Sequence, residues 1–501
     1  MASQRKAGAL LGYANILTKN IVNFMYTPLL LHFLGQDDYG VFQMTNSVVF
    51  ALTLLSAGFS GSYVRFYMIH RTQNEEEKID KLNGMFMMIY AAASLISIIA
   101  GVFLVAFVRQ LFSKGLNPDE VNLARSLMVI MVINIAVTFL STPYTSFITA
   151  KERFVFQQTR QLATTLAQPA LAVVLLLMGF GAIGVSLAIL FVNVALLVLN
   201  AHYARNRLHM RFRFNDLDKN LFKAIAVFSF WILLNQIFDL VNNQVPNFLL
   251  GAMAGASVVA TYSIATQIRN LFFSLSTTIS GVFIPKINRI VATSDDNHKL
   301  TTLMTQLGRY QMLLFWYVYG GFILVGQYFV QIWAGRQNMA AYWLAAAMTL
   351  PVMIPLTQNV GIEIQRAKNR HRARSVIYIL TAALDIAISV ALIPRMGYWA
   401  TAIGYIASIL LGTGLFMNWY YHTRIGLNMM YFWRHQLPII AGGVGVLAVC
   451  LIGAHFIPIH SVSVFIAWIV VYSAVFGGVF WACILNKQEK GLVLNRFAKK
   501  H

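Results

Sequence analysis

The residues best suited to chemistry are charged side chains embedded in long apolar stretches. Arg269 lies near the middle of one such stretch, beside Gln267 and Asn270, and has no acidic residue within helical reach on the same stretch. A charge at mid-bilayer costs from about 3 to above 10 kcal/mol, so it almost always faces a partner or a wet cavity. Arg269 is therefore the strongest candidate for binding an anionic ligand.

Two apolar stretches carry the same set of polar side chains at an offset of 220 residues. Asn15, Lys19 and Asn23 match Asn235, Asp239 and Asn243. Each set is spaced i, i+4, i+8, which places its side chains on one helical face. We expect both faces to line a central binding cleft, where Lys19 could pair with Asp239.

Other polar residues in apolar stretches have two open interpretations. Arg65 and Arg309 lie near stretch ends, where long side chains can snorkel to lipid headgroups, so a structural role and ligand contact are equally open. Glu363 and Asp385 could carry a coupling proton or balance a buried arginine, and Asp239 is the third candidate for coupling.

A neutral polar stripe runs along one further stretch. Such stripes are more typical of hydrogen bonding between helices than of substrate contact. Its members are Asn134, Thr138, Ser141 and Thr145.

The elements that must position these residues are membrane-spanning helices. Of the 501 residues, 58% are hydrophobic and only 11% are charged, which excludes a water-soluble globular enzyme. Because a span needs about 20 mostly apolar residues, the chain is predicted to be an all-α polytopic membrane protein with about 14 transmembrane helices. The expected segments are 10–34, 41–68, 84–108, 122–149, 158–178, 184–201, 221–250, 257–285, 307–329, 341–364, 373–392, 400–420, 438–457 and 464–485.

Charge predicts the orientation of these segments. The chain has 38 Lys and Arg against 17 Asp and Glu, a net charge of +21. Most of the basic residues outside the segments fall in alternate loops and in the two tails, whereas the other loops carry only Arg109, Lys114, Arg336 and Arg395. By the positive-inside rule both termini are cytoplasmic. Orientation explains the net charge, and no nucleic-acid partner is predicted.

A second block repeats at a slightly shorter offset. Residues 150–153 (AKER) resemble residues 367–370 (AKNR), and Gly181 recurs as Gly397. We therefore predict a six-helix bundle over 1–201, a basic cytoplasmic linker over 202–220, a repeat of the bundle over 221–420, and two additional helices with a basic tail over 421–501. Like-oriented bundles around a central site are typical of alternating-access transporters.

The opening YANILTKNIVNFMYTPLLLHFLGQDDYGVFQMTNSVV, with the AKER-type loop, resembles bacterial polysaccharide (O-antigen and exopolysaccharide) repeat-unit flippases. These belong to the multidrug, oligosaccharidyl-lipid and polysaccharide exporter superfamily. The resemblance implies a flippase of the bacterial cytoplasmic membrane that moves an isoprenoid pyrophosphate-linked oligosaccharide from the inner to the outer leaflet. It also implies a cationic central cavity, which Arg269 and Lys19 match by location. The implied partners are the lipid-linked oligosaccharide, membrane lipids, and a polysaccharide polymerase with its assembly machinery.

Two other classes stay open. A multidrug exporter of organic cations would favour acidic cavity residues, which Asp239 and Asp385 mildly support. A polytopic glycosyltransferase or polysaccharide polymerase would need catalytic acids or a sizeable outer loop. The motifs GxxxxGK[ST], HExxH and GxSxG and a Cys/His ligand cluster are absent. We predict no enzyme and no cofactor, with H+ or Na+ coupling open.

Overall fold

Long helices make up nearly all of the chain in the computed structural model, which describes residues 2–56, 59–112, 115–215, 219–281, 284–294, 296–368, 370, 372–487 and 489–491. No strand occurs in these ranges. Eleven helical stretches are long and apolar enough to cross a membrane. They are Ala14–Thr72, Glu76–Ala106, Pro118–Ala150, Phe154–Leu177, Gly181–Arg207, Asn297–Trp333, Arg336–Ala367, Ala373–Met396, Tyr398–Ile425, Met429–Phe456 and Val462–Ile484. The all-α polytopic class is thereby confirmed.

The difference between eleven stretches and fourteen expected segments has two sources. The first, Ala14–Thr72, spans most of the expected segment 10–34 and the expected segment 41–68, and Gly35 lies between them. Gly35 has φ 76°, a left-handed conformation that glycine adopts without a steric cost from Cβ, so the continuous helix bends there. Helices Lys219–Asn243, Val245–Met253 and Ala256–Gly281 coincide with much of the expected segments 221–250 and 257–285 but are not among the eleven, so the count of 14 stays a prediction.

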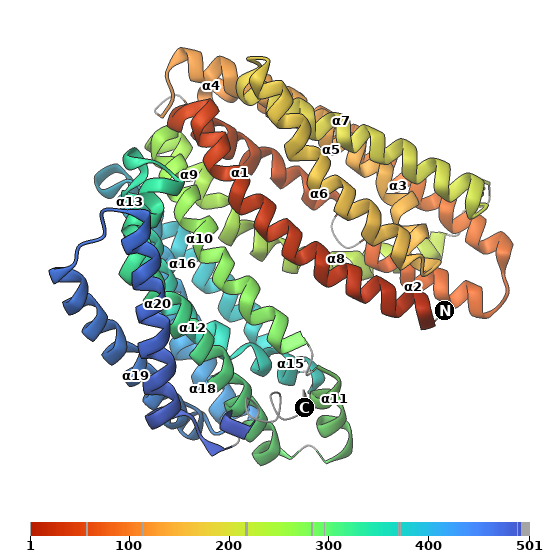
Figure 1. Cartoon of the computed structure of the whole chain (residues 1–501). Coiled ribbons are helices and arrows are strands. Elements are labelled where there is room, and N and C mark those ends of the chain that lie inside the picture. The colour runs from red at the N-terminus through yellow and green to blue at the C-terminus, as the bar shows by residue number, and fades with distance from the viewer. Residues whose placement is uncertain are drawn as a thin grey trace. The chain divides into compact units, whose positions relative to one another are not determined.

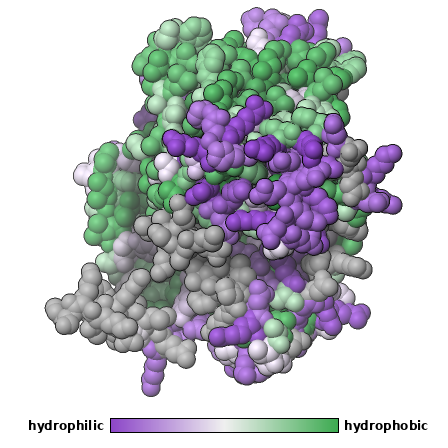
Figure 2. All heavy atoms as spheres, turned by 90° about the vertical axis from the view of Figure 1, so that its right-hand side faces the viewer, coloured by the Kyte–Doolittle hydropathy of each residue, from purple (hydrophilic) through white to green (hydrophobic). Residues whose placement is uncertain are grey.

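The surface of many helices is strongly apolar. Phe103, Leu177 and Phe456 are exposed by 61%, 68% and 77%. Figure 2 shows broad areas of hydrophobic side chains beside a band of hydrophilic ones. Exposed apolar surface on this scale is typical of a protein solvated by lipid.

The chain divides into two compact units (Figure 1). Unit 1 comprises Met1–Ser263 and Ile393–Tyr398. Its elements are α1 (Ala2–Phe50), η1 (Ala51–Ser56), α2 (Phe59–Thr72), α3 (Glu76–Ala106), α4 (Val108–Leu111), α5 (Pro118–Ala150), α6 (Phe154–Leu177), α7 (Gly181–His202), the π-helical turn η2 (Tyr203–Arg207), α8 (Lys219–Asn243), α9 (Val245–Met253) and the start of α10 (Ala256–Gly281).

In unit 1, α1 packs against α5, α6, α7 and α9, and α3 packs against α5. An aromatic cluster that includes Tyr63, Phe86 and Phe147 fills the space among α2, α3 and α5. Where α1 approaches the start of α10, a side chain at Gly40 would collide with the Ala256 carbonyl group, so a glycine is needed for this contact.

Unit 2 comprises Ile264–Leu392 and Trp399–His501. Its elements are the rest of α10, α11 (Ile284–Thr293), α12 (Asn297–Trp333), η3 (Arg336–Asn338), α13 (Ala340–Thr349), η4 (Leu350–Val352), α14 (Met353–Thr357), α15 (Asn359–Ala367), most of α16 (Arg372–Met396), α17 (Tyr398–Ile409), the π-helical η5 (Leu410–Met417), α18 (Asn418–Tyr420), the π-helical η6 (Tyr421–Ile425), α19 (Met429–Phe456), α20 (Val462–Val479) and the π-helical η7 (Phe480–Ile484).

Local sequence explains how the helices of unit 2 begin and break. The stretch from α13 to α15 is broken near Pro351 and Pro355, each of which lacks the amide that a continuous helix requires. Asp296 begins α12 by accepting hydrogen bonds from the backbone amides of His298 and Lys299 at 2.9 and 3.1 Å. The bond from the Lys299 amide contributes most to holding the pKa of Asp296 below its ordinary value.

Candidate functional site

The candidate site is a buried cluster of unit 2 around Arg269 on α10. The Arg269 residue is only 3% exposed, and its guanidinium carbon lies 4.2 Å from the centre of the Tyr405 ring on α17. Its Nη2 donates a hydrogen bond to Asn270 Oδ1 at 3.3 Å, whereas Nε and Nη1 find no acceptor among the described residues. A buried donor without an acceptor costs about 1–3 kcal/mol, and more when it is charged. The cluster is therefore a cationic position with unused hydrogen-bonding capacity.

Asp385 supplies a negative charge to the same neighbourhood. It lies on α16, is 5% exposed, and accepts a hydrogen bond from Ser389 Oγ at 3.2 Å. A side chain at Gly404 would collide with Asp385, so the glycine lets α17 approach the carboxylate closely. No ion pair within 4 Å joins Asp385 to Arg269 in the described part of the chain. Each charge thus keeps capacity for a ligand or a proton.

The two residues that flank Arg269 differ in exposure. Gln267 is half-buried, and Asn270 is exposed while its side chain accepts from Arg269. All three residues lie on α10, and Tyr405 joins them from a distant part of the sequence. Sequence reasoning missed Tyr405, because nothing local distinguishes it from the other tyrosines of the chain.

The polar face of α1 is split between a packed residue and exposed ones. Asn15 is 5% exposed and donates through Nδ2 to the backbone oxygen and the side-chain Oε1 of Gln158 on α6, at 2.8 and 2.7 Å. Lys19 and Asn23 are exposed. Asn15 is therefore tied to α6, whereas Lys19 and Asn23 remain on the surface of unit 1.

The matching face of α8 is described only in part. Asn243 is exposed at the end of α8. The side chains of Asn235 and Asp239 lie outside the described part of the structure, so the pairing of Lys19 with Asp239 stays a prediction.

Arg65 lies at the surface of unit 1, whereas Glu363 is half-buried, with its side chain 18% exposed. Arg65 is exposed, with its guanidinium carbon 5.9 Å from the centre of the Phe66 ring. Glu363 Oε1 lies 2.7 Å from Arg366 Nη1, and the Arg366 side chain is 61% exposed. Glu363 thus belongs to a surface ion pair between neighbouring turns of α15.

The neutral stripe on α5 bonds to another helix, as predicted. Asn193 on α7 donates to Asn134 Oδ1 at 2.7 Å, and Asn200 Nδ2 donates to Ser141 Oγ at 2.9 Å. Arg160 on α6 also donates to the Asn200 side chain. Arg160 is not singled out by the sequence, because it lies at the start of the expected segment 158–178, where a long side chain can snorkel to headgroups.

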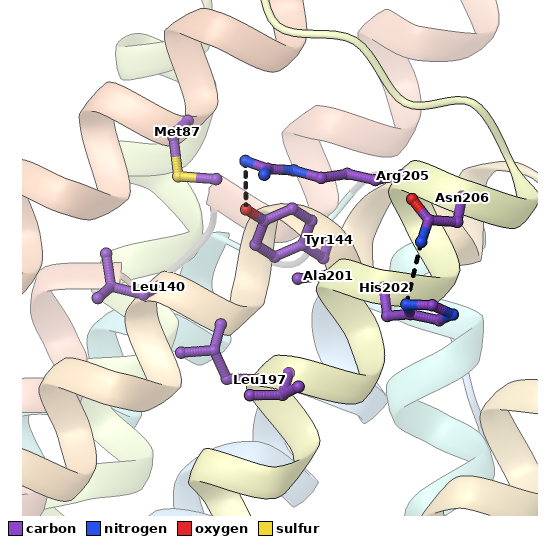
Figure 3. Close-up of a pocket in the computed structure, with 9 residues that line it drawn as sticks. Met87, Leu140, Tyr144, Leu197, Ala201, His202, Arg205 and Asn206 are labelled. Carbon is purple, nitrogen blue, oxygen red and sulfur yellow. Dashed lines mark hydrogen bonds between the residues drawn. The ribbon is translucent and has the colours of Figure 1, made fainter.

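A groove of about 570 Å³ lies on unit 1, apart from the Arg269 cluster (Figure 3). It is lined by residues of α3, α5, α7 and η2. Met87, Leu140, Leu197, Val198 and Ala201 are apolar, whereas Tyr144, His202, Arg205 and Asn206 carry polar groups.

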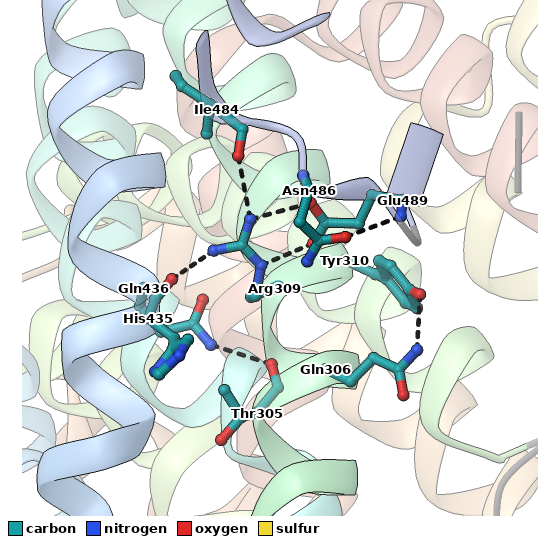
Figure 4. Close-up of polar contacts among 9 residues, drawn as sticks. All are labelled: Thr305, Gln306, Arg309, Tyr310, His435, Gln436, Ile484, Asn486 and Glu489. Carbon is teal, nitrogen blue, oxygen red and sulfur yellow. Dashed lines mark hydrogen bonds and ion pairs between the residues drawn. The ribbon is translucent and has the colours of Figure 1, made fainter. Parts of the chain in front are cut away.

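Arg309 has a structural environment. It is 7% exposed on α12, and its Nε and Nη2 bond to the two carboxylate oxygens of Glu489 at 2.6 and 2.9 Å (Figure 4). It also donates to the backbone oxygens of His435 at 2.6 Å and Ile484 at 3.3 Å. These bonds join α12 to α19 and to the segment after α20, so Arg309 has a structural role, but as a buried ion-pair partner rather than by snorkelling to headgroups.

Comparisons with known proteins place the chain in a family. The model of a family described as "Polysaccharide biosynthesis protein" matches residues 6–291. The uncharacterized membrane protein EpsK of Bacillus subtilis (strain 168) is 22% identical over 482 residues, 94% of each chain. The putative O-antigen transporter of Shigella flexneri is 17% identical over 396 residues, 78% of this chain and 91% of that protein.

The fold also matches a solved transporter. The lipid II flippase MurJ in its inward closed conformation superposes with a TM-score of 0.74 at 12% identity, covering 95% of this chain and 98% of that one. At this identity the likeness shows a shared fold. The resemblance to polysaccharide biosynthesis membrane proteins predicted from the sequence is confirmed. The chain belongs to the polysaccharide biosynthesis protein family, as a multi-pass membrane protein with a fold like that of the lipid II flippase MurJ.

Proposed function

We propose that the chain is a flippase that moves isoprenoid pyrophosphate-linked oligosaccharide units from the inner to the outer leaflet of the bacterial cytoplasmic membrane. The main support for this proposal is the Arg269 cluster. Its buried guanidinium stacks on Tyr405, and two of its nitrogens lack acceptors among the described residues. A pyrophosphate crossing hydrocarbon needs positive charges to offset its own, and a guanidinium binds phosphate oxygens in a fixed fork geometry.

The cargo headgroup would reach Arg269 only when the cluster opens. Arg269 is 3% exposed in this structure, so a ligand must arrive in another conformation. Alternating access supplies such a conformation, because two bundles that rock around a site expose it to one side at a time. Asp385 would be the coupling residue closest to the headgroup, and H+ or Na+ the coupling ion.

Two like-oriented halves, 1–201 and 221–420, are part of the proposal, joined by the linker 202–220 and followed by 421–501. Backbone geometry supports them, because glycines matched by the repeat share a left-handed conformation. Gly35 and Gly255 have φ 76° and 104°, and Gly181 and Gly397 both have φ 52°. Left-handed backbone is uncommon, so its recurrence at matched positions favours a duplication.

A matched hydrogen bond adds independent support. Asn200 on α7 donates to Ser141 on α5 at 2.9 Å, and Gln358 donates to Asn418 at 2.9 Å. Ser141 and Gln358 are 217 residues apart, as in the AKER block, whereas Asn200 and Asn418 are 218 apart, two more than Gly181 and Gly397. In each proposed half a polar bond thus joins the fourth and sixth predicted segments, which favours a duplication without an exact residue match.

The remaining predicted residues extend this proposal. We place both termini in the cytoplasm and the cargo headgroup at the Arg269 cluster, with a polysaccharide polymerase and its assembly machinery receiving the flipped unit. Further cavity residues are Lys19, Asn15, Asn23, Asn235, Asp239, Asn243, Gln267, Asn270 and Arg65, and further coupling residues are Asp239 and Glu363.

Ligand-induced thermal stabilisation of the purified protein tests the proposal. An isoprenoid pyrophosphate glycan at 100 times its Kd should stabilise the protein by about 2.7 kcal/mol, because a ligand stabilises only the state that it binds. Arg269→Ala should lose this shift. Arg374→Ala is the matched control, since Arg374 lies 4.7 Å from the centre of the Tyr378 ring in a similar stack on α16.

Each outcome of this experiment is decisive. A glycan shift that survives in Arg269→Ala would overturn the site. A shift that organic cations alone produce would overturn the cargo and favour the multidrug branch. A different lipid-linked cargo, such as a peptidoglycan or teichoic acid precursor, is indicated if that precursor stabilises wild type but not Arg269→Ala, while the glycan stabilises neither.

A further inference from the structure

The groove on unit 1 combines an apolar floor with polar side chains at one end, which are the two parts that a lipid-binding site needs (Figure 3). Its apolar floor lies within the candidate spans Glu76–Ala106, Pro118–Ala150 and Gly181–Arg207. The groove is open to the surface, since Val198 on its wall is 63% exposed. An exposed apolar groove on membrane-spanning helices would face lipid acyl chains.

The polar part of the groove lies where its third span ends. His202, Arg205 and Asn206 occupy the end of α7 and the π-helical turn η2, and all three are exposed. Asn206 Nδ2 lies 3.0 Å from His202 Nδ1. The π-helical turn brings the three side chains to the mouth of the groove together.

Arg205 is held in place by aromatic rings. Its guanidinium carbon lies 5.8 Å from the centre of the Tyr144 ring and 5.4 Å from that of Phe212, and its Nη2 donates to the Tyr144 hydroxyl at 3.2 Å. No carboxylate lies within ion-pair distance of Arg205 in the part of the chain that the structure describes. The guanidinium is thus positioned without being neutralised.

The segment after η2 is anchored to α3 and fixes the Phe212 ring. Asn83 Nδ2 donates to the Arg211 backbone oxygen at 2.8 Å, and the Arg213 amide donates to the Asp80 backbone oxygen at 3.0 Å. Leu208 and Met210 are buried, whereas the basic side chains that alternate with them are exposed. These are Arg207, His209, Arg211 and Arg213. The mouth of the groove therefore adjoins a fixed row of basic residues.

We propose that this groove binds an anionic phospholipid of the cytoplasmic leaflet, with one acyl chain on the apolar floor and the headgroup phosphate on Arg205, beside His202 and Asn206. We choose an anionic rather than a neutral phospholipid because an unneutralised guanidinium at the membrane surface attracts an anionic headgroup. The apolar floor makes a lipid a better occupant than a soluble phosphate. The predicted topology places the mouth at the cytoplasmic side. The site is separate from the proposed cargo site and does not depend on it.

Native mass spectrometry of the purified protein with added phosphatidylglycerol or phosphatidylethanolamine tests the proposal. Wild type should retain phosphatidylglycerol preferentially, and Arg205→Gln should bind it about fivefold more weakly, the effect of one basic residue at a membrane surface. Arg207→Gln is the matched control, because Arg207 is exposed on the same turn but does not line the groove. Val198→Trp adds bulk to the apolar wall while keeping every charge and should also weaken retention.

Four results would overturn the site. They are unchanged retention in Arg205→Gln, an equal loss in Arg207→Gln, unchanged retention in Val198→Trp, and competition by soluble glycerophosphoglycerol as strong as that by the lipid. The second would indicate diffuse surface charge, and the last two would indicate a headgroup bound without its chain. Loss in both Arg205→Gln and Val198→Trp, with retention in Arg207→Gln, would establish the site.

Discussion

The Arg309–Glu489 ion pair should stabilise unit 2 strongly, and Glu489→Gln tests this. The two side chains are only 9% and 4% exposed. Removing one partner of a buried pair costs about 3–5 kcal/mol, because the other charge is left uncompensated. Arg309 would keep its bonds to the His435 and Ile484 backbone oxygens. We therefore expect the lower end of the range, about 3 kcal/mol.

The assay is SDS-induced unfolding in mixed micelles, followed by tryptophan fluorescence, for Glu489→Gln, Arg309→Met and the double variant. The double-mutant cycle gives the coupling energy between the two side chains, which separates their ion pair from the other bonds that each one makes. The double variant should be more stable than Arg309→Met alone, because it leaves no unpaired buried charge.

Glu363→Gln is the matched control. Glu363 Oε1 lies 2.7 Å from Nη1 of Arg366, whose side chain is 61% exposed. This surface pair should therefore contribute less than about 1 kcal/mol to the free energy of unfolding. A cost of Glu489→Gln no larger than that of Glu363→Gln would refute the reasoning from burial.

Three further predictions use the same purified protein or living cells. Gly35→Ala should lower the free energy of unfolding by about 1 kcal/mol, because a φ of 76° is strained for alanine while no atom lies within 4 Å of the added carbon. Gly40→Ala should lower it more, since the added carbon meets the Ala256 carbonyl group. Equal losses of stability in SDS unfolding would contradict this difference. Asn15→Ala should cost about 1–3 kcal/mol, because both of its bonds to Gln158 are lost, and a neutral result would show that they add nothing. A reporter enzyme inserted at His209 should signal from the cytoplasm, and an outside signal would overturn the predicted topology.

Much of the fold could be predicted because the signals are local. Apolar runs predict membrane helices, and the bond between Asp385 and Ser389 spans a single helical turn. The polar stripe on α5 was interpreted correctly because a neutral side chain inside a membrane needs a partner on another helix.

The missed features are long-range. Arg309 is conspicuous in the sequence, but its partner lies 180 residues away in a tail where Glu489 resembles any surface acid. Tyr405 is one of 21 tyrosines, and only the packing of α17 against α10 distinguishes it. A local pattern sets a helix and its face, whereas the partner across that face depends on the tertiary arrangement.

The separation of Arg309 from Glu489 also matters for biogenesis. Ribosomes add about 5–20 residues per second, so the 180 residues between the two take on the order of ten to forty seconds to synthesise. During that interval Arg309 has entered the membrane-insertion machinery and its carboxylate does not yet exist. The nascent chain must therefore shelter this arginine, by snorkelling to headgroups or within the insertion machinery, until Glu489 has been synthesised. Chains that stop short of Glu489 would keep that charge unpaired and become substrates for membrane quality control.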